Sequence, residues 1–272
     1  MGGNAFSNVK PIKKEHIEDT VNSLIRVAPV GSDYQLLGSA GKKPISGDLD
    51  IAVNLLDPDK QFELFKQMKK LINDHDVRRF GGNISFPWTV PATGEQVQID
   101  FIFGDPEWLS FYYHSPSAAE SKFKGTHRNV AISALASMTD RQELSADVNP
   151  DGNCVDTIRW KWSAKTGLSR IRRKYNERKD GNGYAKTAKE EQFGESLYAP
   201  ADIARVLFKG KYNDKYLTSL ESILDAIDGV YGNDDPEFTE QIYQRMAKYF
   251  QEHHDLKKYD WDYPPEIKRH VK

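Results

Sequence analysis

Three aspartates stand in two segments whose residue pattern predicts strands of one small sheet. Asp48 and Asp50 alternate with apolar residues in 48–53, and Asp100 alternates with apolar residues in 97–103. Since the side chains of a strand alternate between its two faces, each aspartate should project from the face opposite the apolar one. Three carboxylates gathered on one sheet repel one another unless cations neutralise them.

Such a group of carboxylates is suited to hard divalent cations. Mg²⁺ takes oxygen ligands and is usually bound by one or two carboxylates together with substrate phosphates. Two such ions can activate an attacking hydroxyl and stabilise a leaving pyrophosphate in one reaction. We predict that Asp48 and Asp50 hold both ions and that Asp100 holds the ion nearest the acceptor hydroxyl, with Mn²⁺ as an alternative to Mg²⁺. The competing interpretation is a set of solvent-facing acids with no ligand.

The loop ahead of Asp48 contains a Gly-Ser pair that suits phosphate binding. Gly38 lets the backbone approach a triphosphate closely, and the Ser39 hydroxyl and nearby N–H groups can donate to its oxygens. Lys42 and Lys43 add positive charge in the same loop. The segment is not a P-loop, because the spacing of its first glycine is wrong and Lys43 stands where Ser or Thr is required.

A second candidate for phosphate binding lies at the start of a helix predicted over 126–138. The N-terminus of a helix attracts anions, and Lys124 and Arg128 place cations there. These two residues could therefore bind triphosphate or ribose. The alternative is a basic, solvated first turn, and His127 has the weaker case because a lone histidine is usually structural or exposed.

The chain resembles the nucleotidyltransferase superfamily of DNA polymerase β in three segments. They are Leu37-Gly38-Ser39, Ser46-Gly47-Asp48-Leu49-Asp50-Ile51 and, later, Asp100. Members carry Gly-Ser or Gly-Gly, then Asp-x-Asp or Asp-x-Glu, then a carboxylate on a later strand. The resemblance covers about residues 14 to 105. It implies transfer of a nucleoside monophosphate from a nucleoside triphosphate such as ATP to an acceptor hydroxyl, with release of pyrophosphate.

The same resemblance implies a fold but not an acceptor. It implies an α+β chain in which a small mixed sheet flanked by helices forms the nucleotidyltransferase core, followed by a mainly helical domain that closes the nucleotide cleft. The superfamily includes template-independent polymerases, tRNA CCA-adding enzymes, antibiotic adenylyltransferases, protein-modifying toxins and cyclic-dinucleotide synthases. The acceptor must therefore be sought in the rest of the chain.

Hydrophobic periodicity predicts the elements that position these residues. Helices are expected over 14–27, 59–73, 126–138, 200–209, 214–228 and 236–252, and strands over 34–37, 48–55, 84–90 and 96–103. Residues 154–178 could form a hairpin closed at 164–167, and 180–195 are expected to be a polar loop. This divides the chain into a catalytic domain over 1–115 and a mainly helical domain over 116–272 that carries a basic, hairpin-like segment at about 154–195.

Charge is distributed unevenly along the chain. Residues 159–189 hold eleven Lys and Arg against two acids, a net +9, which leaves −11 for the remainder of a chain of net charge −2. Cations interspersed with aromatic rings are typical of nucleic-acid binding, since charges contact phosphates and rings stack on bases. We predict RNA contact through Arg159, Lys161, Arg170, Arg172, Arg173 and Lys174, and RNA with a tRNA-like 3′ end as the acceptor. The alternative is a solvated hairpin with Trp160 or Trp162 packed on the core.

Other classes of protein are less compatible with the sequence. Cys154 is the only cysteine, so an intramolecular disulfide is impossible and a structural zinc site is not expected. The sequence contains no run of about 18 apolar residues, so it predicts no membrane-spanning helix. Its first residues lack the pattern of a secretory signal. We therefore expect a cytoplasmic enzyme that uses a nucleoside triphosphate and contacts no membrane. Transfer to a protein side chain or a small molecule, and a catalytically silent binding partner, remain alternatives.

Overall fold

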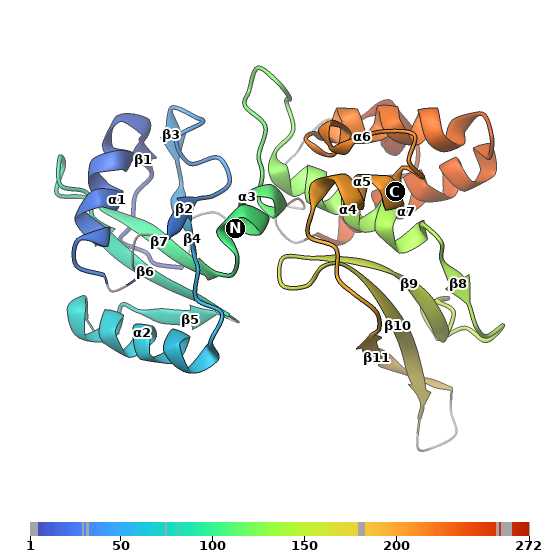
Figure 1. Cartoon of the computed structure of the whole chain (residues 1–272), viewed down its shortest axis with the longest axis horizontal. Helices are drawn as coiled ribbons and strands as arrows, with labels where there is room; N and C mark the ends of the chain where they lie inside the picture. The colour runs from blue at the N-terminus through green and yellow to red at the C-terminus, as the bar shows by residue number, and fades with distance from the viewer. Residues whose placement is uncertain are drawn as a thin grey trace. The chain divides into compact units, whose positions relative to one another are not determined.

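The chain forms two compact units in the structure, a computed structural model that describes residues 5–28, 30, 33–73, 75–80, 82–178, 183–253, 256 and 263–271. The first unit is Met1–Gly125 and the second is Thr126–Lys272 (Figure 1). The sequence predicted the division after residue 115. The ten residues in between lie with the first unit, because they follow a helix that packs on its sheet.

A five-stranded mixed sheet forms the centre of the first unit, with the strand order β2-β4-β7-β6-β5. The two central strands, β4 (Asp48–Val53) and β7 (Gln96–Phe103), are parallel neighbours. The other pairs are antiparallel: β2 (Tyr34–Leu36) with β4, β6 (Asn83–Thr89) with β7, and β5 (Arg78–Phe80) with β6. A separate two-stranded ladder joins β1 (Ile12–Lys13) to β3 (Ile45–Ser46).

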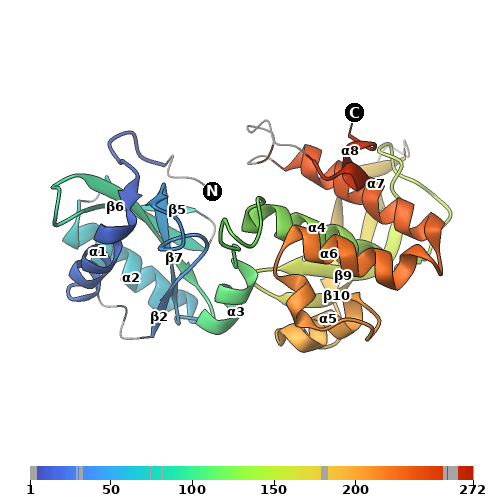
Figure 2. The same cartoon turned by 90° about the horizontal axis from the view of Figure 1, so that it is seen from above.

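The hydrophobic core of this unit lies on one face of the sheet. Leu49 and Ile51 of β4 and Ile99 and Phe101 of β7 are fully buried there. They pack in one cluster with residues of two helices, α1 (Ile17–Ile25), which follows a 3₁₀ turn, and α2 (Pro58–Leu71) (Figure 2). The predicted alternation is therefore confirmed on both strands, and it leaves the three aspartates on the opposite face.

The opposite face is also partly covered, by a helix that the sequence analysis did not predict. α3 (Pro106–Tyr112) contacts β2 and β4. Asp105 caps this helix by accepting a hydrogen bond from the backbone N–H of Trp108 at 2.8 Å, and Pro106 occupies its first turn. Ala52 and Ile102, which share the face of the aspartates, are buried. The aspartates therefore lie on a face that is not simply open to water.

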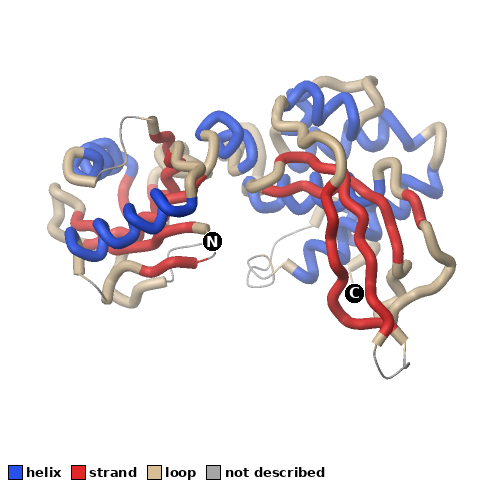
Figure 3. Tube along the Cα trace, turned by 60° about the horizontal axis from the view of Figure 1, so that its bottom comes forward, coloured by secondary structure: helices blue, strands red, loops and turns tan. Residues whose placement is uncertain are grey.

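The second unit combines helices with an antiparallel sheet of order β11-β10-β9-β8 (Figure 3). The helices are α4 (Gly125–Met138), α5 (Pro200–Leu207), α6 (Leu220–Ile227), α7 (Pro236–Glu252) and α8 (Pro265–Lys268). The strands are β8 (Gln142–Glu143), β9 (Asp156–Ser163), β10 (Gly167–Glu177) and β11 (Tyr184–Gln192). The α+β class is as predicted, although this unit contains more strand than a mainly helical domain would.

Two expectations for the second unit are wrong. Residues 184–192 are not a loop but β11, which pairs with β10 over Ile171–Tyr175. Its residues are polar because they lie at a solvated sheet edge, so the pairing leaves no apolar pattern in the sequence. The helix expected over 214–228 is divided, because Ser219 and Ser222 form a capping box that starts α6 after a separate 3₁₀ turn. The predicted hairpin of β9 and β10 is confirmed.

Among the described helices, none is long and apolar enough to cross a membrane.

Candidate metal and nucleotide site

The parallel pairing of β4 with β7 brings the three aspartates together. In this register Asp50 lies opposite Asp100, and Asp48 lies opposite Gln98. One carboxylate oxygen from each of Asp48, Asp50 and Asp100 lies within 4.8 Å of the other two. Oxygen ligands converging at this spacing can share a hard divalent cation. The arrangement anticipated from the sequence is therefore present in the structure.

The electrostatics of the group favour a bound cation. Burial raises the pKa of Asp50 well above its ordinary value, and the neighbouring charges of Asp48 and Asp100 raise it further. Burial also raises the pKa of Asp100. The raised pKa values mean that the ionised forms are destabilised, chiefly by burial and, at Asp50, also by the neighbouring carboxylates. A divalent ion would remove that cost, and this distinguishes the group from an ordinary surface cluster of acids.

Asp100 is held in place by two polar neighbours. The side-chain amide of Gln98 donates to both of its carboxylate oxygens, at 3.1 and 3.0 Å. Gln98 in turn accepts a hydrogen bond from the backbone N–H of Ala5 at 3.0 Å. Ser85, paired across from Asp100 on β6, hydrogen-bonds it as well, and these bonds oppose the rise in its pKa. Such outer partners orient a ligand carboxylate.

The Gly-Ser loop lies directly beside Asp50. The backbone N–H of Leu37 donates to the carbonyl of Asp50 at 2.9 Å. Gly38 has a φ of +64°, and a Cβ atom built there would lie 3.8 Å from an Asp50 carboxylate oxygen. The absence of a side chain thus leaves the backbone accessible next to the carboxylates. The loop continues in a turn in which the N–H of Lys42 donates to the carbonyl of Ser39 at 3.0 Å.

The three lysines predicted to bind phosphate differ in their surroundings. The ammonium of Lys42 donates to the carbonyl of Ser115 at 3.0 Å, and burial lowers its pKa although Glu120 opposes the shift. Burial and then the charge of Lys124 lower the pKa of Lys43. Lys43 and Lys124 are thus close enough to repel each other. Two cations brought together in this way can be stabilised by an anion such as a triphosphate.

Tyr113, at the end of α3, lies near the carboxylates. Burial raises its pKa, and the charges of Tyr112 and Asp50 raise it further. Its ring meets that of Tyr112 edge-on, with centroids 5.0 Å apart. Only the placement of α3 brings these rings to the site. The Asp105-Pro106 pair is a helix-start signal that could have predicted that helix.

The structure does not support Arg128 as a phosphate-binding residue. Its side chain is fully buried in the second unit. The guanidinium donates to the carbonyl of Leu217 and to the side chain of Asn129. Arg128 therefore stabilises the packing around α4, and a lysine or arginine near a helix start did not by itself distinguish this role from ligand binding.

The six basic residues predicted to contact RNA all lie on β9 and β10, but most of them make intramolecular contacts. Arg159, Lys161 and Arg173 converge on Glu190 of β11, with nitrogen to oxygen distances of 3.5, 2.5 and 3.8 Å. These contacts follow from β11, which the sequence analysis missed and which places Glu190 beside the basic strands.

Of the other three basic residues, two make contacts within the chain and one is exposed. Arg172 makes a bidentate pair with Asp156, at 2.9 and 2.6 Å. Arg170 lies over the ring of Trp160 and donates to the carbonyl of Asp140 at 3.2 Å. Lys174 is exposed. Trp162 is buried and donates to Asn129, in agreement with the alternative in which a tryptophan packs on the core.

Comparison of the sequence with protein-family models and with curated proteins gave no match.

Proposed function

We propose that the protein is a metal-dependent nucleotidyltransferase that moves a nucleoside monophosphate from a nucleoside triphosphate to an acceptor hydroxyl and releases pyrophosphate. The observation that carries this proposal is the convergence of Asp48, Asp50 and Asp100 on two adjacent parallel strands, with ligand oxygens within 4.8 Å of one another. The position of Gly38 against Asp50 adds a place for the triphosphate beside the same carboxylates.

The residues present fit divalent metal ions. All three ligands are carboxylates, the donors that Mg²⁺ and Mn²⁺ prefer. Asp50 and Asp100 have raised pKa values, so positive charge would stabilise their ionised forms. When bound, a pair of such ions would polarise the α-phosphate and neutralise charge on the attacking and leaving oxygens.

The protein's own groups then have distinct tasks. Asp48 and Asp50 would hold the metal ions, and Asp100, which Gln98 and Ser85 orient, would complete the ligand set on the acceptor side. The backbone at Gly38 and the hydroxyl of Ser39 donate to phosphate oxygens. Lys43 and Lys124 place positive charge in the same unit, where it can offset the negative charge of the leaving pyrophosphate.

RNA is the acceptor that we propose to test first. Support for RNA comes from the cations of β9 and β10 that remain exposed, such as Lys174, and from the stacked pair of Arg170 and Trp160. The ion pairs on Glu190 and Asp156 reduce this support, because they neutralise part of the basic surface within the chain. Transfer to a protein side chain therefore belongs in the same experiment.

The test incubates the full chain with Mg²⁺, each α-³²P-labelled nucleoside triphosphate and total cellular RNA. We expect label in RNA that ribonuclease removes and protease does not. Label that only protease removes would replace RNA by a protein acceptor. The Asp48→Ala/Asp50→Ala variant should transfer no label, whereas Asp59→Ala, an exposed acid in the first turn of α2, should behave like the unaltered chain.

Two results would count against the reaction itself. One is equal transfer by the Asp48→Ala/Asp50→Ala variant and the unaltered chain, because the carboxylates would then play no part. The other is the absence of any Mg²⁺-dependent pyrophosphate release with all four triphosphates and all acceptors. That outcome would favour a catalytically silent binding partner.

A further inference from the structure

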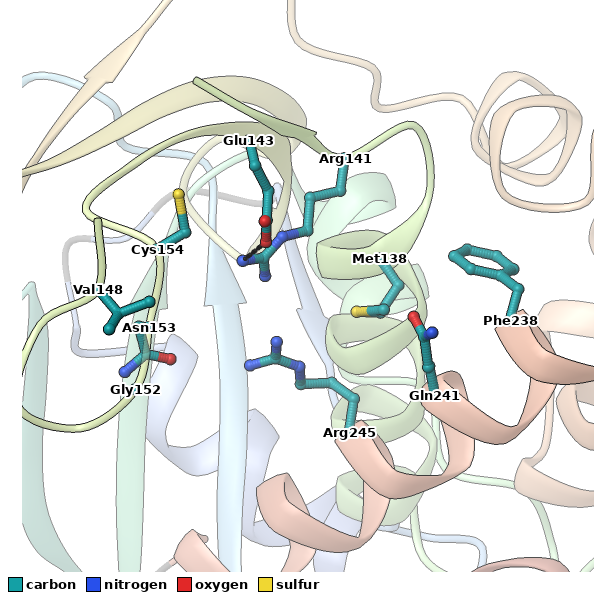
Figure 4. Close-up of a pocket in the computed structure, with 10 residues that line it drawn as sticks. All are labelled: Met138, Arg141, Glu143, Val148, Gly152, Asn153, Cys154, Phe238, Gln241 and Arg245. Atoms are coloured by element: carbon teal, nitrogen blue, oxygen red, sulfur yellow. Dashed lines mark hydrogen bonds and ion pairs between the residues drawn. The ribbon is translucent and has the colours of Figure 1, made fainter. Parts of the chain in front are cut away.

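A second site with the character of a ligand pocket lies within the Thr126–Lys272 unit. It is a cavity of about 430 Å³, which falls in the usual range for small-molecule sites. Its walls come from the end of α4, from β8, from the 148–154 loop and from α7. Figure 4 shows the guanidinium groups of Arg141 and Arg245 pointing into the same space, with the side chain of Asn153 beside them. No aspartate of the proposed metal site contributes to it.

The cations around this cavity are drawn together without enough acid to neutralise them. Arg141 and Arg159 have side chains only 16% and 11% exposed. Arg141 pairs with Glu143 at 2.8 Å, and that carboxylate is 59% exposed. Arg159 reaches the Tyr249 hydroxyl at 3.4 Å and Glu190 at 3.5 Å. Three arginines from three elements thus share one region.

Arg245 lines the cavity and is half-buried. Its guanidinium lies over the ring of Tyr249 at 5.9 Å, but it makes no hydrogen bond or ion pair within the described part of the chain. Burial lowers its pKa, and the charges of Arg141 and Arg159 add to the shift, whereas Tyr249 and Glu252 oppose it. Glu252 offsets only part of the cost of this half-buried arginine, so a bound anion would stabilise it further.

The hydroxyl of Tyr249 is affected by the same cations. Burial alone would raise its pKa, yet its pKa is lowered, because a hydrogen bond with Ser137 and the charges of Arg159 and Arg245 outweigh burial. The local field therefore favours negative charge strongly enough to shift a neighbouring phenol.

The loop that forms the opposite wall is fixed before any ligand arrives. The buried side chain of Asn149 accepts hydrogen bonds from the backbone of Asp151 at 3.1 Å and of Asn153 at 2.8 Å. Gly152 adopts a φ of +71° within this turn. The side-chain amide of Asn153 is left without a hydrogen bond to the described residues, and it faces the cavity (Figure 4). A pre-formed wall lowers the entropic cost of binding.

We propose that this cavity binds a nucleotide-sized ligand through a phosphate monoester. The fork of an arginine matches the oxygens of a phosphate. Arg245 offers such a fork, and Arg141, which pairs with the lining residue Glu143, adds a second guanidinium beside it. Asn153 adds a neutral donor. Met138 and Phe238 form an apolar wall at which a planar ring can pack, with the amide of Gln241 beside it. A nucleoside monophosphate has this combination of parts.

The first experiment measures binding to a chain whose metal site is disabled. The full-length Asp48→Asn/Asp50→Asn variant is titrated by calorimetry in EDTA with AMP, with inorganic phosphate and with adenosine. We expect AMP to bind, phosphate to bind more weakly, and adenosine not to bind. Loss of AMP binding in this variant, when the unaltered chain binds it, would overturn the proposal, since the nucleotide would then occupy the metal site. Failure of both chains to bind AMP would overturn it as well.

Substitution of Arg245 locates the site. On the same background, Arg245→Gln should weaken AMP binding about 10- to 100-fold, as expected for loss of a charge-assisted hydrogen bond, and Arg245→Lys should weaken it less. The matched control is Arg205→Gln, which removes an arginine that is 69% exposed and paired with Asp202 in the same unit. Equal affinity in Arg245→Gln and Arg205→Gln would overturn the proposal.

The unaltered chain offers a measurement that needs no substitution. Cys154 lines the cavity and is the only cysteine. It is buried, and its thiol lies within donating distance of two carbonyls, those of Ser145 at 3.0 Å and Asp156 at 3.2 Å. AMP should slow its reaction with a small thiol reagent in EDTA, with the same half-saturation as the calorimetry. An unchanged rate at saturating AMP would place the nucleotide elsewhere.

Discussion

The two sheets of the molecule differ in whether their clustered like charges have partners of opposite charge. On β4 and β7, Asp50 lies across from Asp100 with Asp48 beside it, and the pKa of Asp50 rises because burial and the two neighbouring carboxylates disfavour its ionised form. On β9 to β11, clustered cations pair with carboxylates of the chain, which offset part of their charge. There a single carboxylate, Glu190, receives three of them.

This difference separates a ligand site from a structural charge network. An internal ion pair lowers the free energy of the folded chain without any ligand. A like-charge cluster raises that free energy and is tolerated only if something else offsets it. Uncompensated charge, rather than the amount of charge, is therefore the basis on which we propose the two ligand sites. By the same criterion the Arg245 cavity is a better candidate for an anion than the basic strands beside it.

The largest effect is expected at Asp50. Asp50→Asn should reduce the rate of transfer by about 1,000-fold, since a metal ligand contributes several kcal/mol to the transition state. The same change should raise the free energy of unfolding in EDTA by about 1 to 3 kcal/mol, because it removes a charge placed among like charges. Chemical denaturation and the transfer assay, applied to one preparation, measure both.

The dependence on pH gives the sign of this effect. The pKa of Asp50 is raised in the folded state, so the protonated side chain costs nothing at low pH. The destabilisation develops as the pH rises above the ordinary carboxyl pKa of about 4 toward the raised value. The stability gained by Asp50→Asn should therefore grow over that range and disappear below it. Mg²⁺ should stabilise the unaltered chain and not the variant. A variant less stable than the parent in EDTA at neutral pH would contradict the comparison.

The sequence predicted the three aspartates of this cluster, but not the residues that surround and orient them. Alternation fixes which face each aspartate occupies, because one misplaced residue would bury a carboxylate in the core. The pairing of β4 with β7 could not be derived in the same way, since it depends on contacts between distant segments. Nor did the pattern indicate that Gln98 and Ser85 bind Asp100, or that Tyr113 lies near Asp50.

The failures in the second unit have two causes. β11 is a polar edge strand held by backbone pairing, and neither face carries the alternation from which a strand is recognised. Without β11 the basic segment looked uncompensated, because Glu190 lay just outside the span counted as basic. The prediction for Arg128 was not supported for a different reason. A buried arginine that donates to a carbonyl cannot be distinguished in the sequence from one that binds phosphate.

A pair of glycines can sharpen the proposed role of the loop beside Asp50. Gly38 and Gly41 both have positive φ values, +64° and +74°, so Gly38→Ala and Gly41→Ala should each cost about 1 kcal/mol of stability. Only at Gly38 does the added Cβ approach Asp50, at 3.8 Å, whereas nothing lies within 4 Å at Gly41. Gly38→Ala should therefore raise KM for the nucleoside triphosphate about 10-fold. Equal KM values in the two variants would remove Gly38 from the site.

The smallest effect is expected at Glu190. Glu190→Gln releases Arg159, Lys161 and Arg173 from a common partner, at a cost of less than about 1 kcal/mol for a partly exposed network. If these strands contact RNA, affinity should rise about threefold and its salt dependence should steepen. Glu191→Gln makes the same change of net charge on the adjacent residue, which lies across from Arg172 instead. A gain in RNA affinity that is confined to Glu190→Gln would mean that Glu190 competes with RNA for these cations. The same gain in both variants would reflect net charge alone. No gain in either would assign the network to the fold and leave RNA without a surface on this sheet.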